Sequence, residues 1–292
     1  MKPAPFEYLR PSSLAEATAM LRANADRDPK LLAGGQSLVP MMNFRMAQPE
    51  VLVDLNRVPG LAFVEARGDD IAIGAMTRHN DVAGHPLVAR HLPLVREAYH
   101  FVAHHTVRNR GTIGGNVCHA DSASEMPTVL TTLDARFVIA SADGRRTVAA
   151  DDFFLGVYTT AVEADEVLVE ILVPKPAEGA RAAFEEVSLR KGDFAIAAVA
   201  AEVRLSGGVV ASARIGIAGV AERGLRATRM EAALAGTVPA MPAIEVAADA
   251  AIEAIDFSGT AAISPAYRRD LTRALLVRAV TRAAGLAGET SQ

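Results

Sequence analysis

The first 75 positions contain one set of apolar residues at helical spacing and several short apolar runs of the kind that form strands. Leu14, Ala17 and Leu21 recur at helical spacing after Ser13, which with Glu16 has the spacing of a capping box, so a helix is predicted to about residue 25. Strands are predicted for the short apolar runs at residues 30–33, 51–55, 62–65 and 71–75. The last two runs flank a polar turn and should form a hairpin. This order of elements predicts two small α+β lobes, over about residues 1–57 and 58–175.

The middle of the chain continues this alternation of helices and strands. Apolar residues at 92, 95, 98, 102 and 103 predict a helix over residues 92–103 that packs on a sheet. The sequence Ser122-Ala123-Ser124-Glu125 has capping-box spacing and precedes a helical run over residues 126–133. Strands are predicted at residues 135–140 and 167–173. Because two prolines, at 174 and 176, interrupt both helix and ladder hydrogen bonding, we place a domain boundary at residues 174–180.

The last third of the chain changes to strands followed by helices. Strands are predicted at residues 184–190, 195–205 and 209–220, with a Ser-Gly-Gly turn between the last two. Helices are predicted to start at Thr228, capped through Glu231, at Pro242, and at Ser264-Pro265. After a first domain over residues 1–175, residues 180–287 should therefore form a C-terminal domain of three strands and three helices.

Composition and charge narrow the classes of partner. The chain has 292 residues, 50% of them apolar, and 30 basic against 34 acidic residues give a formal net charge of −4. No broad cationic surface is expected, which argues against nucleic acid as the main partner. The single cysteine, Cys118, cannot form an internal disulfide, and it cannot support an iron–sulfur cluster, which needs about four thiolates.

The N-terminal sequence MKPAPFEYLRP lacks the apolar core of a signal peptide. No segment approaches about 18 uninterrupted apolar residues, the length that a membrane-spanning helix requires. We therefore expect a cytoplasmic protein without a membrane span.

Two loops with paired glycines carry the candidate chemistry. They are Ala33-Gly34-Gly35-Gln36-Ser37 and Gly111-Thr112-Ile113-Gly114-Gly115-Asn116, and each leads into a segment that starts helically. Because glycine tolerates positive φ and has no Cβ, backbone N–H groups in such loops can converge on the phosphate oxygens of a ligand. The two loops could hold one diphosphate between them, or they could be ordinary turns. Neither has the G-x-G-x-x-G or P-loop pattern, which argues against those nucleotide sites.

The loops and their surroundings resemble a known family. The segments AGGQS and TIGGN, the sequence VRNRGTIGGNVCHADSASEMP around the second, and the later RKGDFA segment at residues 190–195 are similar to the FAD-binding medium subunits of molybdenum hydroxylases. These are the flavoprotein chains of the carbon monoxide dehydrogenase and xanthine dehydrogenase family. The resemblance runs from about residue 6 to about residue 284. It implies an α+β fold, with a two-lobed FAD-binding domain of the vanillyl-alcohol-oxidase type followed by the three-strand, three-helix domain.

The resemblance also implies which residues bind FAD. The loop residues whose backbone would hold the diphosphate and the ribityl chain are Leu32, Ala33, Gly34, Gly35, Gln36, Ser37, Leu38, Thr112, Ile113, Gly114, Gly115 and Asn116. Glu125 stands where the family has an acidic residue that hydrogen-bonds the cofactor. Leu168 matches an apolar position near the adenine or the flavin, and Phe194 an often aromatic position beside the flavin ring.

The pattern alone allows simpler roles for these three side chains. Glu125 can be a helix-capping carboxylate, while Leu168 and Phe194 can be strand core residues. Glu185 stands where the xanthine dehydrogenase branch has a cofactor-contacting lysine, so that contact is not expected here. Gly115→Val should expel FAD, because the side chain would meet the diphosphate and would force a φ value that Val avoids.

Three histidines near the second loop, His104, His105 and His119, suggest a metal site or covalent flavin attachment. Adjacent histidines on a strand point to opposite faces, and a third ligand with suitable spacing is missing. Subunits of the family that the chain resembles hold flavin noncovalently. We therefore expect neither a metal site nor covalent flavin attachment, and we assign no catalytic residue to the chain. We expect Arg108-Asn109-Arg110 to anchor the loop or contact a partner chain.

Three functional hypotheses follow from the sequence. The resemblance implies an electron-transfer subunit that carries FAD, with a small [2Fe–2S] subunit and a large molybdopterin subunit as partners, expected as a dimer of heterotrimers. A stand-alone flavin oxidase or reductase is the alternative enzyme. A binding or scaffold module without nucleotide is the third hypothesis, and the presence of both glycine loops argues against it.

Overall fold

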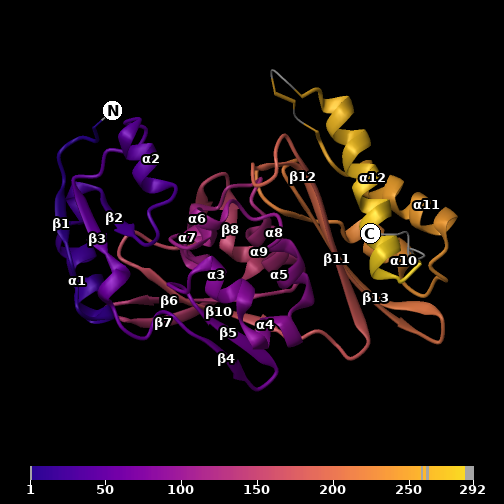
Figure 1. Ribbon diagram of the computed structural model, residues 1–292, viewed down its shortest axis with the longest axis horizontal. Coiled ribbons are helices and arrows are strands. Elements are labelled where there is room, and N and C mark those ends of the chain that lie inside the picture. The colour runs from indigo at the N-terminus through magenta and orange to yellow at the C-terminus, as the bar shows by residue number, and fades with distance from the viewer. Residues whose placement is uncertain (1, 258, 261–262, 287–292) are drawn as a thin grey trace.

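The computed structural model describes residues 2–257, 259–260 and 263–286, and it arranges three sheets in succession along the long axis of the molecule (Figure 1). The sheets have three, five and four strands, and a two-stranded hairpin lies beside the second. Helices accompany each sheet, so the predicted α+β class is confirmed. The predicted outer domain limits, residues 1 and 287, lie outside the described residues.

The N-terminal lobe is a small parallel sheet with helices. Its strands are β1 (Glu7–Leu9), β2 (Pro29–Leu32) and β3 (Val51–Asp54), in the order β1-β3-β2. Its helices are α1 (Leu14–Ala23) and α2 (Leu38–Asn43). The predicted cap of α1 is present, because the Ser13 hydroxyl accepts a hydrogen bond from the Glu16 amide at 3.1 Å. The first glycine loop, residues 33–37, connects β2 to α2.

The second lobe contains a five-stranded antiparallel sheet in the order β4-β5-β10-β6-β7. Its strands are β4 (Val64–Arg67), β5 (Asp70–Gly74), β6 (Arg136–Ser141), β7 (Gly144–Ala149) and β10 (Val167–Pro174). Its helices are α3 (His79–Gly84), α4 (Pro86–His91), α5 (Pro93–Ala98), α6 (His105–Arg108), α7 (Ile113–His119), α8 (Glu125–Thr132) and α9 (Ala150–Phe153). A hairpin, β8 (Phe154–Gly156) and β9 (Thr159–Thr160), follows α9.

Both faces of this sheet are buried, and strand periodicity decides which core each side chain joins. Phe137 and Ile139 of β6 pack with the helices of the second lobe, whereas Val138 and Ala140 pack with α1 and β3 of the N-terminal lobe. Alternate residues of a strand point to opposite faces, so one strand serves two cores. The sheet is therefore the layer on which the N-terminal lobe rests.

Two helix predictions in the second lobe are wrong. The predicted helix over 92–103 is only the six-residue α5, since Pro93 starts a new helix after α4 and the chain leaves helical geometry after Ala98. The predicted Ser122 cap is also wrong, because Ser124 is the N-cap residue and α8 begins at Glu125. A capping box therefore does not explain Glu125.

The C-terminal domain is a four-stranded sheet with three helices on one face. The strands are β11 (Ala180–Ser188), β12 (Ala195–Ser206), β13 (Val209–Ala218) and the two-residue β14 (Leu225–Arg226). The helices are α10 (Thr228–Leu234), α11 (Met241–Ile252) and α12 (Pro265–Ala283). The short β14 makes four strands where three were predicted. Thr228 does not cap α10, since it lies inside the helix after the N-cap residue Ala227.

The C-terminal sheet is also buried on both faces, which explains the nearly continuous apolar run of β12. Val199 and Ala201 face α10–α12, while Ala198 and Ala200 face the core of the second lobe. The small alanine side chains let the sheet lie close to both layers.

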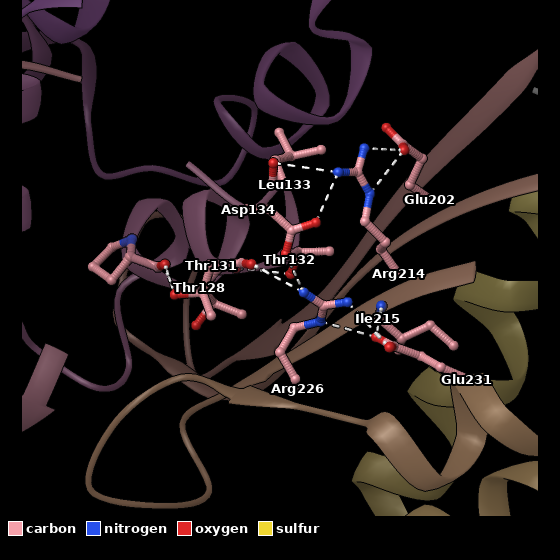
Figure 2. Close-up of polar contacts among 11 residues, drawn as sticks. Thr128, Thr131, Thr132, Leu133, Asp134, Glu202, Arg214, Ile215, Arg226 and Glu231 are labelled. Carbon is pink, nitrogen blue, oxygen red and sulfur yellow. Dashed lines mark hydrogen bonds and ion pairs between the residues drawn. The ribbon is translucent and has the colours of Figure 1, made fainter. Parts of the chain in front are cut away.

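A polar network joins the C-terminal sheet to the end of α8 (Figure 2). Asp134, which follows α8 at φ 54°, accepts hydrogen bonds from Arg214 at 3.1 Å and Arg226 at 2.6 Å. Each arginine also has its own carboxylate partner, Glu202 for Arg214 and Glu231 for Arg226. Arg226 also donates to the Thr131 carbonyl in α8, and Arg214 donates to the Leu133 carbonyl just after that helix. The C-terminal domain therefore holds the helix whose other end carries Glu125.

Among the described residues, no helix is both long enough and apolar enough to cross a membrane.

Candidate functional site

The two glycine loops meet in space, although 74 or more positions separate them in the sequence. A Cβ placed on Gly34 would lie 2.4 Å from the Arg110 carbonyl oxygen and 2.6 Å from the Gly111 Cα atom. A Cβ on Gly115 would lie 3.4 Å from the Ala33 Cβ atom. Only a residue without a side chain allows the backbone of the first loop to approach the second this closely at position 34. The predicted proximity of the loops is therefore present.

A cavity of about 450 Å³ lies against the first loop. Its walls come from three parts of the N-terminal lobe and from the residue that precedes the second loop. The lining residues are Tyr8, Leu32, Ala33, Gly34, Gly35, Gln36, Val39, Pro40, Asp54, Asn56 and Arg110. The cavity has one cation at its edge, the exposed Arg110, which makes no ion pair with any described residue. A positive charge beside a glycine loop suits an anionic group such as a diphosphate.

The first loop offers free peptide N–H groups. Gly35 has φ 71°, a conformation that favours glycine, and its carbonyl accepts from the Val39 amide at 3.1 Å. Within the described part of the chain, the N–H groups of residues 34–38 meet no hydrogen-bond acceptor. Ser37 precedes α2 without capping it through its hydroxyl, and the Gln36 side chain donates to the Gly34 carbonyl at 3.3 Å. These donors can serve a ligand in the adjoining cavity.

The second loop differs, because its peptide N–H groups are mostly used within the fold. Ile113 donates to the Thr77 carbonyl at 3.0 Å, and Gly114 donates to the Ala75 carbonyl at 2.9 Å. The Gly115 amide donates to the Thr112 hydroxyl at 3.0 Å. Neither Gly114 nor Gly115 has positive φ, since both lie in α7. The expectation that this loop turns a line of free N–H groups toward a ligand is therefore wrong, as is the φ argument for Gly115.

The second loop instead presents a polar side chain. The Asn116 amide nitrogen donates to the Ser124 hydroxyl at 2.8 Å, while its buried Oδ1 atom has no partner among the described residues. Glu125 follows Ser124 and is only 6% exposed. Burial raises the pKa of Glu125 to about 7. The hydrogen bond between Asn116 and Ser124 therefore places Asn116 beside the segment that carries Glu125.

A second buried carboxyl group lies near Glu125. Both carboxyl oxygens of Glu186, on β11, are buried without a hydrogen-bond partner in the described structure. Burial, and then the charge of Glu125, raise the pKa of Glu186 to about 8. Near neutral pH these two side chains therefore hold protons more readily than ordinary carboxyl groups.

Leu168 and Phe194 occupy different environments. Leu168 is 4% exposed in β10 and belongs to the core of the second lobe, so the core interpretation is correct for this residue. Phe194 is 60% exposed on the loop between β11 and β12, so the core interpretation is wrong for it. The loop is anchored nearby, because the Ala195 amide donates to the Ala123 carbonyl at 3.3 Å. An exposed aromatic beside the segment that carries Glu125 is available to a ligand.

Glu185 has a structural role on the other face of β11. Its carboxylate is 7% exposed and pairs with Arg278 at 3.0 Å and Arg282 at 2.5 Å, both on α12. These ion pairs tie β11 to α12, and the expectation that Glu185 does not replace the lysine contact stays a prediction.

The histidines and the cysteine do not form a metal centre in the described structure. His104 and His105 lie at the start of α6 rather than on a strand, so the expected strand geometry is wrong. His119 stacks on Tyr158 with ring centroids 4.8 Å apart. Burial raises the pKa of the Cys118 thiol to about 12, which disfavours the thiolate. Among the described residues, no group of three or more His, Cys, Asp or Glu side chains could hold a metal ion.

Arg108 anchors the segment before the second loop, as expected. Its guanidinium donates to the carbonyls of Val102 at 2.6 Å and Ala103 at 2.8 Å. Arg110, two positions later, lines the cavity instead.

Sequence interpretation missed several cavity residues. Tyr8 comes from a three-residue strand too short for a period-2 signal. Asp54 is the last residue of β3 and Asn56 lies two positions later, and polar residues at the end of a parallel strand are a recognisable signal for a site. The hydroxyl of Tyr8 donates to Asp54. Although burial opposes it, hydrogen bonds from Tyr8 and Asn56 lower the pKa of Asp54.

The fold and this site define a flavoprotein of two domains, and comparisons with known proteins agree. The family described as "FAD binding domain in molybdopterin dehydrogenase" matches residues 4–176. The family described as "CO dehydrogenase flavoprotein C-terminal domain" matches residues 182–283. Together these two matches cover nearly the whole chain.

Individual relatives give a more particular identification. The chain is 45% identical to the carbon monoxide dehydrogenase medium chain of Hydrogenophaga pseudoflava over 86% of this chain and 88% of the relative. It is 38% identical to the 6-hydroxypseudooxynicotine dehydrogenase complex subunit alpha of Paenarthrobacter nicotinovorans, over 100% and 99% of the two chains. A solved carbon monoxide dehydrogenase from Hydrogenophaga pseudoflava has a chain that superposes with TM-score 0.94 at 43% identity, over 98% of this chain and 99% of that chain. The protein belongs to the family of FAD-binding medium subunits of molybdenum hydroxylases.

Membership of this family confirms the predicted cofactor, FAD, and the predicted class, an oxidoreductase subunit. The residues of the cavity suit such a group. Gly34 and Gly35 both line the cavity, the N–H groups of the first loop are free within the described structure, and Arg110 supplies positive charge.

Proposed function

We propose that the FAD diphosphate binds against the first glycine loop and that the flavin ring extends toward Asn116, Glu125 and Phe194. The cavity beside residues 34–38 and its free N–H groups support the first part. The unpartnered Asn116 oxygen and the exposed Phe194 ring support the second. Leu168 would support the site from the core without facing solvent. The second loop would contribute the Asn116 side chain and a close-packed surface for the first loop, rather than a row of free N–H groups.

We also propose the division of the chain into an FAD-binding domain over residues 1–175, with lobes at 1–57 and 58–175, and a C-terminal domain over residues 180–287. The two family matches, over 4–176 and 182–283, support this division. The gap between β10, which ends at Pro174, and β11, which starts at Ala180, supports the position of the linker.

The proposed activity is electron transfer from the [2Fe–2S] clusters of a small partner subunit to an external acceptor. When bound, FAD supplies the ability to exchange electrons singly or in pairs. The protein's own residues would bind and orient it, and the buried carboxyls of Glu125 and Glu186 would hold protons close to it. The single cysteine supports this role, because the chain cannot ligate an iron–sulfur cluster by itself and must receive electrons from another protein.

The proposed partners are the small [2Fe–2S] subunit and a large molybdopterin subunit, assembled as a dimer of heterotrimers in the cytoplasm. Two relatives are named as medium chains or complex subunits, which supports a multi-subunit assembly. Substrate hydroxylation would then take place in the large subunit.

The observation that carries this proposal is the match of the whole chain to medium subunits together with the cavity at the first loop. Purification of the native protein tests it. We expect two further subunits, iron, sulfide and molybdenum in the preparation, and about one FAD per chain that acid precipitation releases. The isolated chain should show no hydroxylase activity. A solitary chain that oxidises a small organic substrate without molybdenum would instead establish the stand-alone oxidase.

A further inference from the structure

Two side chains outside the glycine loops connect the loops to each other. Asn56 follows β3, and its Nδ2 atom donates to the Ala33 carbonyl at 2.9 Å. Arg78 precedes α3, and its Nη2 atom donates to the Asn56 Oδ1 atom at 2.5 Å. The other terminal nitrogen of Arg78 donates to the Arg110 carbonyl. Ala33 and Arg110 each precede the first glycine of a loop, so this chain of hydrogen bonds links the two loop entrances.

The chemistry of the partners determines how the Asn56 amide is oriented. Arg78 can only donate, so the atom of Asn56 that faces it must be the oxygen. The Ala33 carbonyl and the Asp54 carboxylate can only accept, so the atom that faces them must be the nitrogen. A reversed amide would place like groups together at all three contacts. The orientation of Asn56 is therefore fixed by its neighbours.

Fixing the Ala33 carbonyl also fixes a donor of the first loop. The peptide between Ala33 and Gly34 is planar and trans, so its N–H group points opposite to its carbonyl. Because the carbonyl points to Asn56, the Gly34 N–H group points away from it and stays among the free donors of the loop. Rotation of this peptide would turn that donor away from a ligand.

Arg78 is itself held in register with the second loop. Its backbone forms an antiparallel bridge with Thr112. In this bridge the His79 amide donates to the Gly111 carbonyl at 3.1 Å, and the Ile113 amide donates to the Thr77 carbonyl at 3.0 Å. Partial burial of its guanidinium, and then the charge of Arg110, lower the pKa of Arg78. The Arg110 carbonyl that Arg78 contacts is the same atom that lies against Gly34.

We propose that Asn56 and Arg78 are positioning residues, which tie the Ala33–Gly34 peptide to the Arg110 carbonyl and so present the first loop to the FAD diphosphate. The proposal rests on the proposed function, in which the diphosphate lies against this loop. Neither side chain needs to contact the reacting part of the cofactor. Loss of either side chain would disturb the orientation of the first loop and so weaken FAD binding.

The experiment measures FAD affinity for the full chain after removal of its flavin, by quenching of flavin fluorescence. We expect Asn56→Ala and Arg78→Met each to weaken FAD binding about tenfold, and the double variant to be hardly weaker than either single one, because both act through one chain of contacts. Asn56→Asp keeps an acceptor for Arg78 but loses the donor to Ala33, so it should resemble Asn56→Ala. Arg78→Lys keeps the charge but cannot reach two acceptors with a planar fork, so it should not restore affinity.

Arg57→Met is the matched control, because it removes a nearby positive charge from an exposed side chain that forms no hydrogen bond or ion pair with the described residues of either loop. It should bind FAD as the wild type does. Phosphorus NMR at saturating FAD gives a second measurement: the diphosphate resonances should shift in Asn56→Ala and Arg78→Met and stay unchanged in Arg57→Met. Variants with wild-type affinity, a fully additive double variant, or unshifted resonances would overturn this inference alone. A wild-type chain that binds no FAD would contradict the proposed function itself.

Discussion

The two glycine-pair loops share a sequence pattern but use their peptide groups differently. In the first loop, the N–H groups of residues 34–38 are free within the described structure and border a cavity of about 450 Å³. In the second, Ile113, Gly114 and Gly115 donate inside the fold. The first loop can therefore offer donors to a ligand, while the second provides a close-packed surface against which the first is held.

Their glycines are also required for different reasons. Gly35 needs its positive φ, whereas Gly34 and Gly114 need the absence of a Cβ. At Gly34 the close neighbour is the backbone of the second loop, and at Gly114 it is the Ala75 backbone at 2.5 Å. A glycine pair therefore does not by itself identify a phosphate-binding loop, because close packing of chain segments selects the same residue.

The largest effect is expected from breaking the contact between the loops. Gly34→Ala would place a Cβ 2.4 Å from the Arg110 carbonyl, so the loops must separate. We expect FAD binding to weaken about 100-fold, equivalent to about 3 kcal/mol. Titration of the flavin-free chain measures it. Gly84→Ala is the control, since a Cβ there meets nothing within 4 Å, and equal losses in both variants would exclude a specific role for Gly34.

A smaller effect is expected from pH and the carboxyl group beside the second loop. The pKa of Glu125 is raised to about 7, above the ordinary value of 4.5 that it regains on unfolding. Its contribution to stability is therefore complete below about pH 4.5 and is lost as the pH rises toward 7. For the flavin-free chain, we expect the free energy of unfolding to fall by about 2 kcal/mol over this range from Glu125. Chemical denaturation at several pH values measures the slope, which Glu125→Gln should reduce. An unchanged slope in that variant would show that Glu125 is ionised in the folded chain.

The smallest effect is expected from a side chain at Gly115. Because its φ is not positive, the original backbone argument for this position does not hold. A Cβ there lies 2.9 Å from the Thr112 hydroxyl and 3.4 Å from the Ala33 Cβ atom, so the Thr112 hydroxyl must shift. We expect Gly115→Val to weaken FAD binding about tenfold, or about 1.4 kcal/mol, because the larger side chain would displace Ala33 in the first loop. Gly115→Ala should lose less in the same titration. Complete loss of FAD in the alanine variant would mean that position 115 itself contacts the diphosphate.

Local signals in the sequence predicted those features whose cause is local. The caps at Ser13 and Ser264 and the strands β3, β6 and β10 all depend on residues within a few positions of each other. The AGGQS and TIGGN segments identified the family, and family membership confirmed FAD. The predicted helix limits were wrong at Pro93, where a proline interrupts the apolar period. The predicted caps were wrong at Ser122 and Thr228, where capping-box spacing alone did not identify the N-cap residue.

The sequence by itself indicated the class of fold and several of its strands, because apolar period, proline and glycine act through the neighbouring backbone. The family and its cofactor were indicated by the resemblance of the AGGQS and TIGGN segments to known medium subunits. Only the tertiary structure decided how each glycine is used. Whether a peptide N–H is free depends on what lies across from it, and for Gly114 that is Ala75, nearly 40 positions away in the chain. The same reason separates Phe194 from Leu168: both are apolar, but Phe194 is exposed on the loop before β12 and Leu168 is buried in β10.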